Sequence, residues 1–401
     1  MFKKVLAVVL SMVLVVSLGL LFASAQPVGE SSPAELQFRE DGTFHILQIA
    51  DIQDAGILRG DIRRFLHEAI QQEQPDLIVL TGDNIRTSQG VRRSLRAISQ
   101  FMRIFEHYGI PVAVTFGNHD ATNNATKVQQ MEHYNSYRVS LMRSDFSQNL
   151  DDPTAATLAN FYLPIRSSCG QNPYAFNLWF FDLEGTGAWR GIPDAVLDWY
   201  RETSNALAAA NGGELVPSIV FQHIPPIEIW DYLDYHFGGT EGSQWRQFGG
   251  FYTMSPDPNY PVEWNFMDEH PCPANTGDYL RGQFDVHLDQ GDVLMIVVGH
   301  CHANNFRVNW QGIDIMNTGG INPAPYPIPQ QVMRTITIHE DRANTCPRDI
   351  ETRTLAFANT IFSTRFTATW YNWTLFVVII IAAAALLAGA VTLVVLRLRR
   401  T

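Results

Sequence analysis

The chain has 401 residues, of which 46% are hydrophobic, and its formal net charge is −12. This length and apolar content suffice for one large domain or two smaller ones. The acidic balance argues against a nucleic-acid scaffold, which needs a basic face, but it does not exclude a phosphate-bearing substrate, because bound metal ions supply local positive charge.

The first 25 residues predict a secretory signal peptide. Two lysines precede the apolar run 5–22, and the small residues Ala23-Ser24-Ala25 follow as a cleavage pattern. Because the run is long for a signal, an uncleaved anchor is the alternative. Residues 26–43 are polar and predict a linker.

Residues 44–340 predict one α/β domain. Its first part alternates short apolar strands with amphipathic helices. The expected strands cover residues 45–50, 77–80 and 112–116, and the expected helices lie around 62–70 and 91–108. Such a βαβαβ order implies that neighbouring strands are parallel.

Polar residues follow the end of each of these strands. Asp51 follows the first strand, Gly82-Asp83-Asn84 the second, and Gly117-Asn118-His119-Asp120 the third. Open α/β sheets bind ligands beyond the carboxyl ends of their strands. We therefore expect these side chains to meet in one crevice.

The second half of the domain repeats this arrangement. A strand at 218–222 ends at His223, and a strand at 292–298 ends at Gly299-His300-Cys301-His302. Residues 312–320 predict one more strand and turn. The segment 227–288 is rich in aromatic residues and glycine, and we expect it to influence substrate choice.

The C-terminal region predicts a membrane anchor. Residues 341–374 are expected to form a stalk, 375–396 a transmembrane helix and 397–401 a cytoplasmic tail, because tryptophan and tyrosine precede the apolar run and three arginines follow it. This places the domain on the lumenal or extracellular side, as in a type I membrane protein of the secretory pathway. The alternatives are a buried core helix and a removable lipid-anchor signal.

A secretory location has two further consequences. Asn124-Ala125-Thr126 matches the glycosylation pattern and lies near the expected crevice, whereas Asn372 lies too close to the membrane for use. The four cysteines allow two disulfides with three connectivities, and Cys301 could instead be a buried thiol. The four are Cys169, Cys272, Cys301 and Cys346.

The polar clusters together form a set of metal ligands with oxygen and nitrogen donors. Such donors suit Zn, Fe or Mn. Two metals about 3.5–4 Å apart can generate a hydroxide near neutral pH and hold both oxygens of an in-line displacement, as in phosphate-ester hydrolysis. Each cluster alone has an ordinary explanation, such as a turn or a core histidine, but five clusters in order at strand ends disfavour it.

The order of these motifs resembles the calcineurin-like metallophosphoesterase superfamily. The strings at 48–51, 81–85, 223–225 and 299–306 are similar to the branch containing plant purple-acid-phosphatase-29-type enzymes and fungal relatives. The resemblance covers about residues 44–340. It implies a four-layer α/β metallophosphoesterase fold with a central β-sandwich flanked by helices. It also implies two metal ions and hydrolysis of phosphomonoesters or phosphodiesters.

The resemblance also implies residue roles. One metal would be held by Asp51, Asp83 and His302. The other would be held by Asp83, Asn118, His223 and His300. His119 would contact the phosphate and protonate the leaving group, with Asp120 orienting it.

Two residues depart from the family pattern. Arg86 replaces the tyrosine that gives purple phosphatases their colour, so we expect no such colour. Gln53 replaces a histidine of the first metal site, and its carbonyl oxygen is a weaker and harder donor. With Gln53 we expect the first site to lose its metal easily and to accept Mn²⁺. Gln53 also leaves open a rival reading, a membrane-tethered binding protein without activity; the complete set of other ligands favours a hydrolase.

Overall fold

The computed structural model describes residues 35–54, 56–86, 90–148, 157–182, 191–237, 266–267, 280–322, 331–340, 349–356 and 381. The predicted signal peptide and cytoplasmic tail lie outside these residues, as does the predicted transmembrane segment apart from Ile381. Within the described ranges, no helix has the length and apolarity that a membrane crossing requires.

The first sheet has five strands in the order β14–β13–β2–β3–β4. β2 is parallel to β3, and β3 is parallel to β4, with helices α2 and α3 as the crossovers. The predicted βαβαβ unit is therefore confirmed. The bounds are β2 Thr43–Ile49, α2 Gly60–Glu73, β3 Leu77–Thr81, α3 Val91–Tyr108, β4 Val112–Thr115, β13 Val332–His339 and β14 Glu351–Ala356.

The second sheet has nine strands in the order β1–β6–β7–β8–β10–β12–β11–β9, with β5 paired to β6. The strands are β1 Leu36–Gln37, β5 Phe146–Gln148, β6 Thr157–Arg166, β7 Phe176–Phe180, β8 Ser218–Phe221, β9 Phe266–Met267, β10 Val293–Val298, β11 Asn304–Trp310 and β12 Ile313–Asn317. The remaining helices are α4 Asn118–Ala121, α5 Lys127–Tyr134, α6 Asp194–Ala210, α7 Ile229–Phe237 and α8 Gln283–Gln290.

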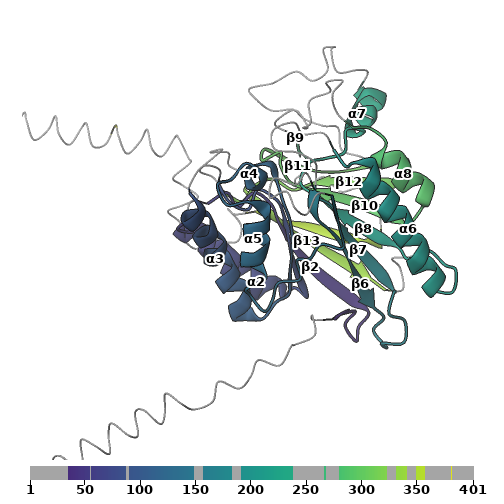
Figure 1. Ribbon diagram of the computed structural model, residues 1–401, viewed down its shortest axis with the longest axis horizontal. Helices are drawn as coiled ribbons and strands as arrows, with labels where there is room; N and C mark the ends of the chain where they lie inside the picture. The colour runs from purple at the N-terminus through teal and green to yellow at the C-terminus, as the bar shows by residue number, and fades with distance from the viewer. Residues whose placement is uncertain are drawn as a thin grey trace, which may run out of the picture. The chain divides into compact units, whose positions relative to one another are not determined.

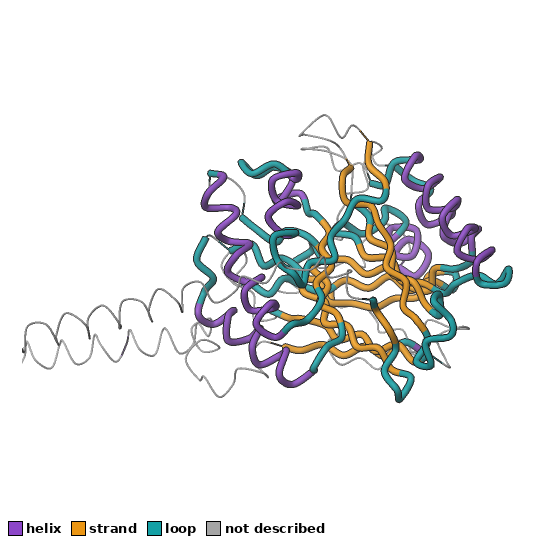
Figure 2. The backbone as a smooth tube through the Cα atoms, turned by 60° about the horizontal axis from the view of Figure 1, so that its bottom comes forward, coloured by secondary structure: helices purple, strands orange, loops and turns teal. Residues whose placement is uncertain are grey.

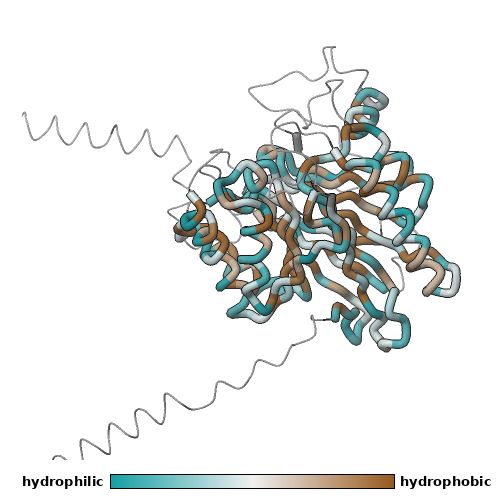
Figure 3. The backbone as a smooth tube through the Cα atoms, in the orientation of Figure 1, coloured by the Kyte–Doolittle hydropathy of each residue, from teal (hydrophilic) through white to brown (hydrophobic). Residues whose placement is uncertain are grey.

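Alternating side chains of the second sheet divide between two cores, as the two-residue period of a strand requires. In β10, Met295 and Val297 belong to the core shared with the first sheet, whereas Ile296 and Val298 belong to the core that contains α6 and α8. Helices α2, α3 and α5 cover one side of the paired sheets, and α6 and α8 cover the other (Figure 1). The strands run between these two helical layers (Figure 2). The apolar segments gather there as well (Figure 3). The predicted four-layer sandwich is confirmed.

Two predicted domain boundaries are wrong. β1 lies in the predicted linker 26–43 and pairs with β6. β14 lies in the predicted stalk 341–374 and pairs along its whole length with residues 332–337 of β13. Both are outer strands of their sheets, and residues such as Glu351 and Arg353 face outward. An edge strand with a polar outer face has the composition of a linker, and only its hydrogen-bonded partner identifies it.

The core that contains α6 and α8 includes a buried histidine, and we predict that this histidine makes the stability of the protein depend on pH. His287 stacks on Phe181 with ring centroids 5.9 Å apart and meets Tyr200 edge-on at 4.7 Å. Burial lowers the pKa of His287 from 6.5 to about 3. The folded state therefore favours the neutral ring, and this contribution is present above pH 6.5 and is lost as the pH falls from 6.5 towards about 3.

The test compares the wild type with His287→Phe, which keeps an aromatic ring at this position. The free energy of unfolding of the wild type, relative to the variant, should fall by up to ~1.4 kcal/mol per pH unit below pH ~6.5. Urea unfolding at several pH values between about 4.5 and 7 measures it. Parallel pH profiles would show that His287 contributes no such term.

Candidate metal centre

The predicted ligands lie at the carboxyl ends of strands from both sheets. Asp51, Asp83 and His300 have φ values of 54°, 49° and 66°, a left-handed conformation that is uncommon for residues other than glycine. The turns are tied together, because the Asp51 N–H donates to Gly82 O at 3.2 Å. The local backbone is thus turned sharply where each ligand leaves its strand.

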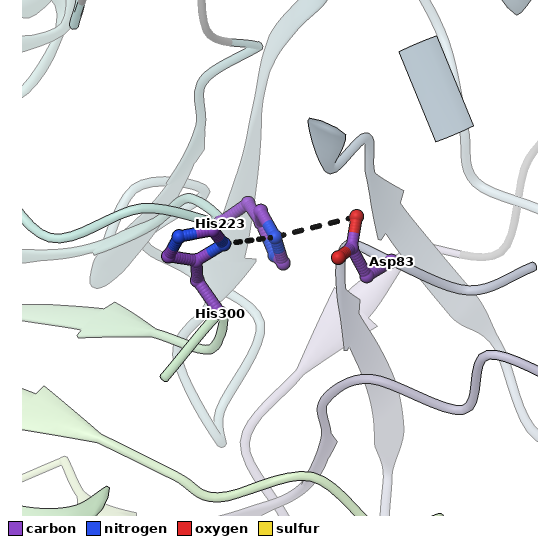
Figure 4. A group of neighbouring side chains, drawn as sticks. All are labelled: Asp83, His223 and His300. Atoms are coloured by element: carbon purple, nitrogen blue, oxygen red, sulfur yellow. Dashed lines mark hydrogen bonds and ion pairs between the residues drawn. The ribbon is translucent and has the colours of Figure 1, made fainter. Parts of the chain in front are cut away.

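Asp83, His223 and His300 form one group of converging side chains (Figure 4). His223 Nε2 lies 3.4 Å from Asp83 Oδ1 and 3.1 Å from His300 Nδ1. Asn118 Oδ1 lies 3.1 Å from the same His223 nitrogen. His223 Nδ1 lies 2.8 Å from Thr81 O. When Nδ1 carries the proton and donates it to this carbonyl, Nε2 keeps its lone pair for a cation. We call this group, with Asn118, the second metal position.

Asp51, Asp83 and His302 form the other group, which we call the first metal position. His302 Nε2 lies 3.3 Å from Asp51 Oδ1. Gln53 reaches the same place, with its Nε2 2.9 Å from Asp83 Oδ2 and 3.2 Å from His302 Nε2. In each group one atom per residue lies within 4.8 Å of the others, and Asp83 belongs to both. The structure therefore brings all seven predicted metal-binding residues together.

The donor set fits divalent cations. Asp51 Oδ1 is buried and accepts no hydrogen bond from any described residue. A buried anionic oxygen needs a partner, and a cation beside the imidazole of His302 would provide one. Carboxylates, an amide oxygen and imidazoles are common ligands of Mn, Zn and Fe.

The charges of the second metal position support each other. Burial alone would raise the pKa of Asp83, but neighbouring histidines, chiefly His223, hold it well below its usual range. Burial alone would lower the pKa of His223, but Asp83 raises it to about 9. Asp83 is thus kept anionic, as a metal-bridging carboxylate must be.

Two glycines permit the close approach of these ligands. A Cβ at Gly82 would lie 2.6 Å from His223 Nδ1, and a Cβ at Gly117 would lie 2.3 Å from the main-chain nitrogen of Asp83. Both distances are far below a normal contact. The glycines of the Gly82-Asp83 and Gly117-Asn118 motifs are therefore required by packing at the ligands.

His119 differs from the other histidines because its side chain remains accessible. The ring is 40% exposed, and its Nε2 lies 3.8 Å from Asp83 Oδ2. The main-chain N–H of His119 donates to Asp83 Oδ1 at 2.7 Å. His119 is therefore held at the centre by its backbone, while its ring can reach a bound molecule.

The described hydrogen bonds of the Asp120 carboxylate come from main-chain groups and one amide, and its predicted role in orienting His119 stays a prediction. Its buried carboxylate accepts hydrogen bonds from the main-chain N–H groups of Gly117 at 2.9 Å, Asn84 at 3.1 Å and Ile85 at 3.1 Å. Burial, followed by the charge of Asp83, raises the pKa of Asp120 to about 7. These donors occupy the carboxylate oxygens, so Asp120 ties together the two loops that carry Asp83 and His119.

A series of buried side-chain hydrogen bonds behind the metal centre was not predicted from the sequence. Gln48 donates to Thr81 Oγ1 at 2.8 Å and accepts from Thr318 Oγ1 at 2.5 Å. Arg334 Nε donates to Thr318 Oγ1 at 3.0 Å. This series joins the two sheets beside the strand ends that carry the ligands. A glutamine inside the apolar strand 45–50 is the signal that could have revealed it.

The other predicted features are only partly described. Asn124 is exposed, and its Oδ1 accepts from the Gly90 N–H at 3.0 Å. Cys301 is buried and Cys169 is exposed, while Cys272 and Cys346 lie outside the described residues. The segment 227–288 contributes α7, β9 and the start of α8, and most of its centre also lies outside them.

The four-layer sandwich with two ligand groups sharing one aspartate defines the chain as a metallophosphoesterase. The family model described as calcineurin-like phosphoesterase matches residues 44–304. The chain belongs to this family.

Relatives of the chain include plant and yeast proteins. It is 26% identical over 326 residues to "Probable inactive purple acid phosphatase 28" of Arabidopsis thaliana, covering 73% of each chain. It is 24% identical to "Phosphatase DCR2" of Saccharomyces cerevisiae over 71% of this chain and 48% of that protein. A solved dimetal phosphatase from Danio rerio aligns with 78% of this chain and 99% of its own, at 14% identity and a TM-score of 0.42.

Proposed function

We propose that the protein is a metal-dependent hydrolase of phosphate esters that prefers phosphomonoesters. The observation that carries this proposal is the shared Asp83, which joins two buried ligand groups beside the accessible ring of His119. Two metal ions bound there would activate a water molecule and neutralise charge on the phosphate.

The protein's own residues have distinct tasks in this proposal. The first and second metal positions, with Gln53 beside the first, would hold the two ions. The His119 ring binds the phosphate ester and gives a proton to the departing oxygen, which is general acid catalysis. Asp120 keeps the loops of Asp83 and His119 in register through its main-chain hydrogen bonds.

The test of this function is hydrolysis by the full-length protein in detergent at saturating Mn²⁺. An aryl phosphate, an alkyl phosphate and a bis-aryl phosphate diester are compared by kcat/KM. We expect measurable turnover, with the aryl monoester favoured over the diester. Faster cleavage of the diester would replace our proposal with a phosphodiesterase.

The rival function is a tethered binding protein on the same scaffold. Gln53 at the first metal position favours it, and the Arabidopsis thaliana relative is named as a probable inactive phosphatase. Binding of phosphate by the metal-loaded protein, without turnover of any of the three esters, would support this function and overturn the hydrolase.

We also propose that the protein is a type I membrane protein of the secretory pathway. The sequence supports a cleaved signal at 1–25, an anchor at 375–396 and a tail at 397–401, with the domain lumenal or extracellular. The exposed Asn124 is the proposed glycosylation site.

Glycosylation tests this topology directly. Glycosidase treatment of the protein from its own cells should lower its mass, and Asn124→Gln should abolish this shift. Protease added outside sealed vesicles with a lumenal orientation should leave the domain intact. A mass shift that persists in the variant would exclude Asn124 as the site, and digestion of the domain in intact vesicles would overturn the topology.

A further inference from the structure

The Gln53 side chain lies within the first metal position. Its Nε2 donates to Asp83 Oδ2 at 2.9 Å and lies 3.2 Å from His302 Nε2. These two acceptors belong to two of the three residues of the first metal position, Asp51, Asp83 and His302. The amide NH2 group therefore already binds ligands that a cation would use.

The backbone of Gln53 holds the amide in this place. Its N–H donates to Asp83 O at 3.1 Å, and its carbonyl accepts from Asn322 Nδ2 at 3.2 Å. Its φ is 37°, and only 5% of the residue is exposed. The side chain thus starts from a fixed, buried point and is directed into the centre.

The chemistry of an amide fixes the direction of its two ends. A carboxylate accepts hydrogen bonds, so Asp83 selects the NH2 end of Gln53 and repels the oxygen end. That nitrogen carries no lone pair for a cation, because it is delocalised into the carbonyl. A metal can therefore enter only if the amide rotates or moves away and gives up both hydrogen bonds.

We propose that the Gln53 amide is a placeholder for the cation at the first metal position, and that it makes this position the weaker of the two. At the second metal position the contacts are made between the ligands themselves, because His223 Nε2 lies beside Asn118 Oδ1 and His300 Nδ1, and Asn118 presents its amide oxygen. The protein then holds one metal tightly and exchanges the other with its surroundings. This deepens the proposed function and rests on it, because hydrolysis would require the exchangeable metal.

The difference in metal affinity between the two positions follows from the hydrogen bonds that the Gln53 amide must give up. One of the two is made to a charged group, and breaking both costs about ten-fold or more in affinity. We therefore expect the wild type to keep one metal per chain after dialysis against a weak chelator. We expect the second equivalent of Mn²⁺ to bind at least ~10-fold more weakly than the first.

Three variants of the full chain test the assignment. Gln53→His replaces the amide with an imidazole nitrogen donor and should bring the metal content close to two. Gln53→Ala removes the competitor and should bind the second equivalent of Mn²⁺ at least as tightly as the wild type. Gln71→His adds a histidine on the exposed part of α2 and should leave both equivalents unchanged.

Metal content by mass spectrometry and Mn²⁺ titration calorimetry give the readout without any substrate, and circular dichroism checks the fold of each variant. Two equally tight metals in the wild type would overturn the inference. The inference would also be overturned if a folded Gln53→Ala protein bound the second equivalent of Mn²⁺ ten-fold more weakly than the wild type does. Gln53 would then be a ligand through Oε1.

Metal binding tests the role of Gln53, whereas ester hydrolysis tests the proposed function. Two tight metals together with ester hydrolysis would overturn the inference and support the proposed function. Unequal metals without hydrolysis at saturating Mn²⁺ would support the inference and overturn the proposed function.

Discussion

Asp83→Ala is expected to lower kcat/KM for a phosphomonoester by at least ~10³-fold, because stabilisation of the transition state by metal ions is worth several kcal/mol. Asp83 is the one residue that belongs to both ligand groups. It also accepts the His119 main-chain N–H and lies 3.4 Å from His223 Nε2. Its removal should therefore empty both metal positions and release the loop that carries His119.

The measurements are metal content and kcat/KM, each compared with the wild type. Asp289→Ala is the matched control, because Asp289 is an exposed carboxylate of α8. The control should keep both metal content and turnover. A folded Asp83→Ala protein that retained two metals would show that the bridging role is wrong.

His119→Ala is expected to lower kcat by about 10²–10⁴-fold, the usual range for a lost general acid, while metal content stays unchanged. The metals should remain because the ring is not one of the converging ligand atoms, and because alanine keeps the main-chain N–H that binds Asp83 Oδ1. Turnover and metal content measured on the same sample test this separation.

The leaving group gives a sharper test of the His119 role. An alkyl alcohol needs a proton as it departs, whereas a nitrophenol does not. The defect of His119→Ala should therefore be larger for an alkyl phosphate than for a nitrophenyl phosphate. His107→Ala, which changes an exposed histidine of α3, is the control. Equal defects for both substrates would assign His119 to phosphate binding alone, and loss of metal would make it a ligand.

The interior of the fold could be predicted from the sequence, whereas its edges could not. The predicted helix at 91–108 has the same bounds as α3, because apolar residues with helical spacing leave no other regular structure that buries them. The sequence predicts a linker and a stalk where β1 and β14 lie. Their polar faces carry no such pattern, and their identity depends on pairing with β6 and β13.

The sequence alone determined which residues meet at the candidate metal centre. Asp51, Asp83, His223 and the two histidines at 300 and 302 each follow an apolar strand, and ligand sites of α/β sheets lie beyond the carboxyl ends of their strands. What each side chain does there was decided only by the tertiary structure. Asp120 binds main-chain donors of a loop 36 residues away, and the Gln53 amide turns its NH2 group towards Asp83 and His302. Hydrogen bonds are directional and join residues distant in the chain, so motif spacing cannot specify them.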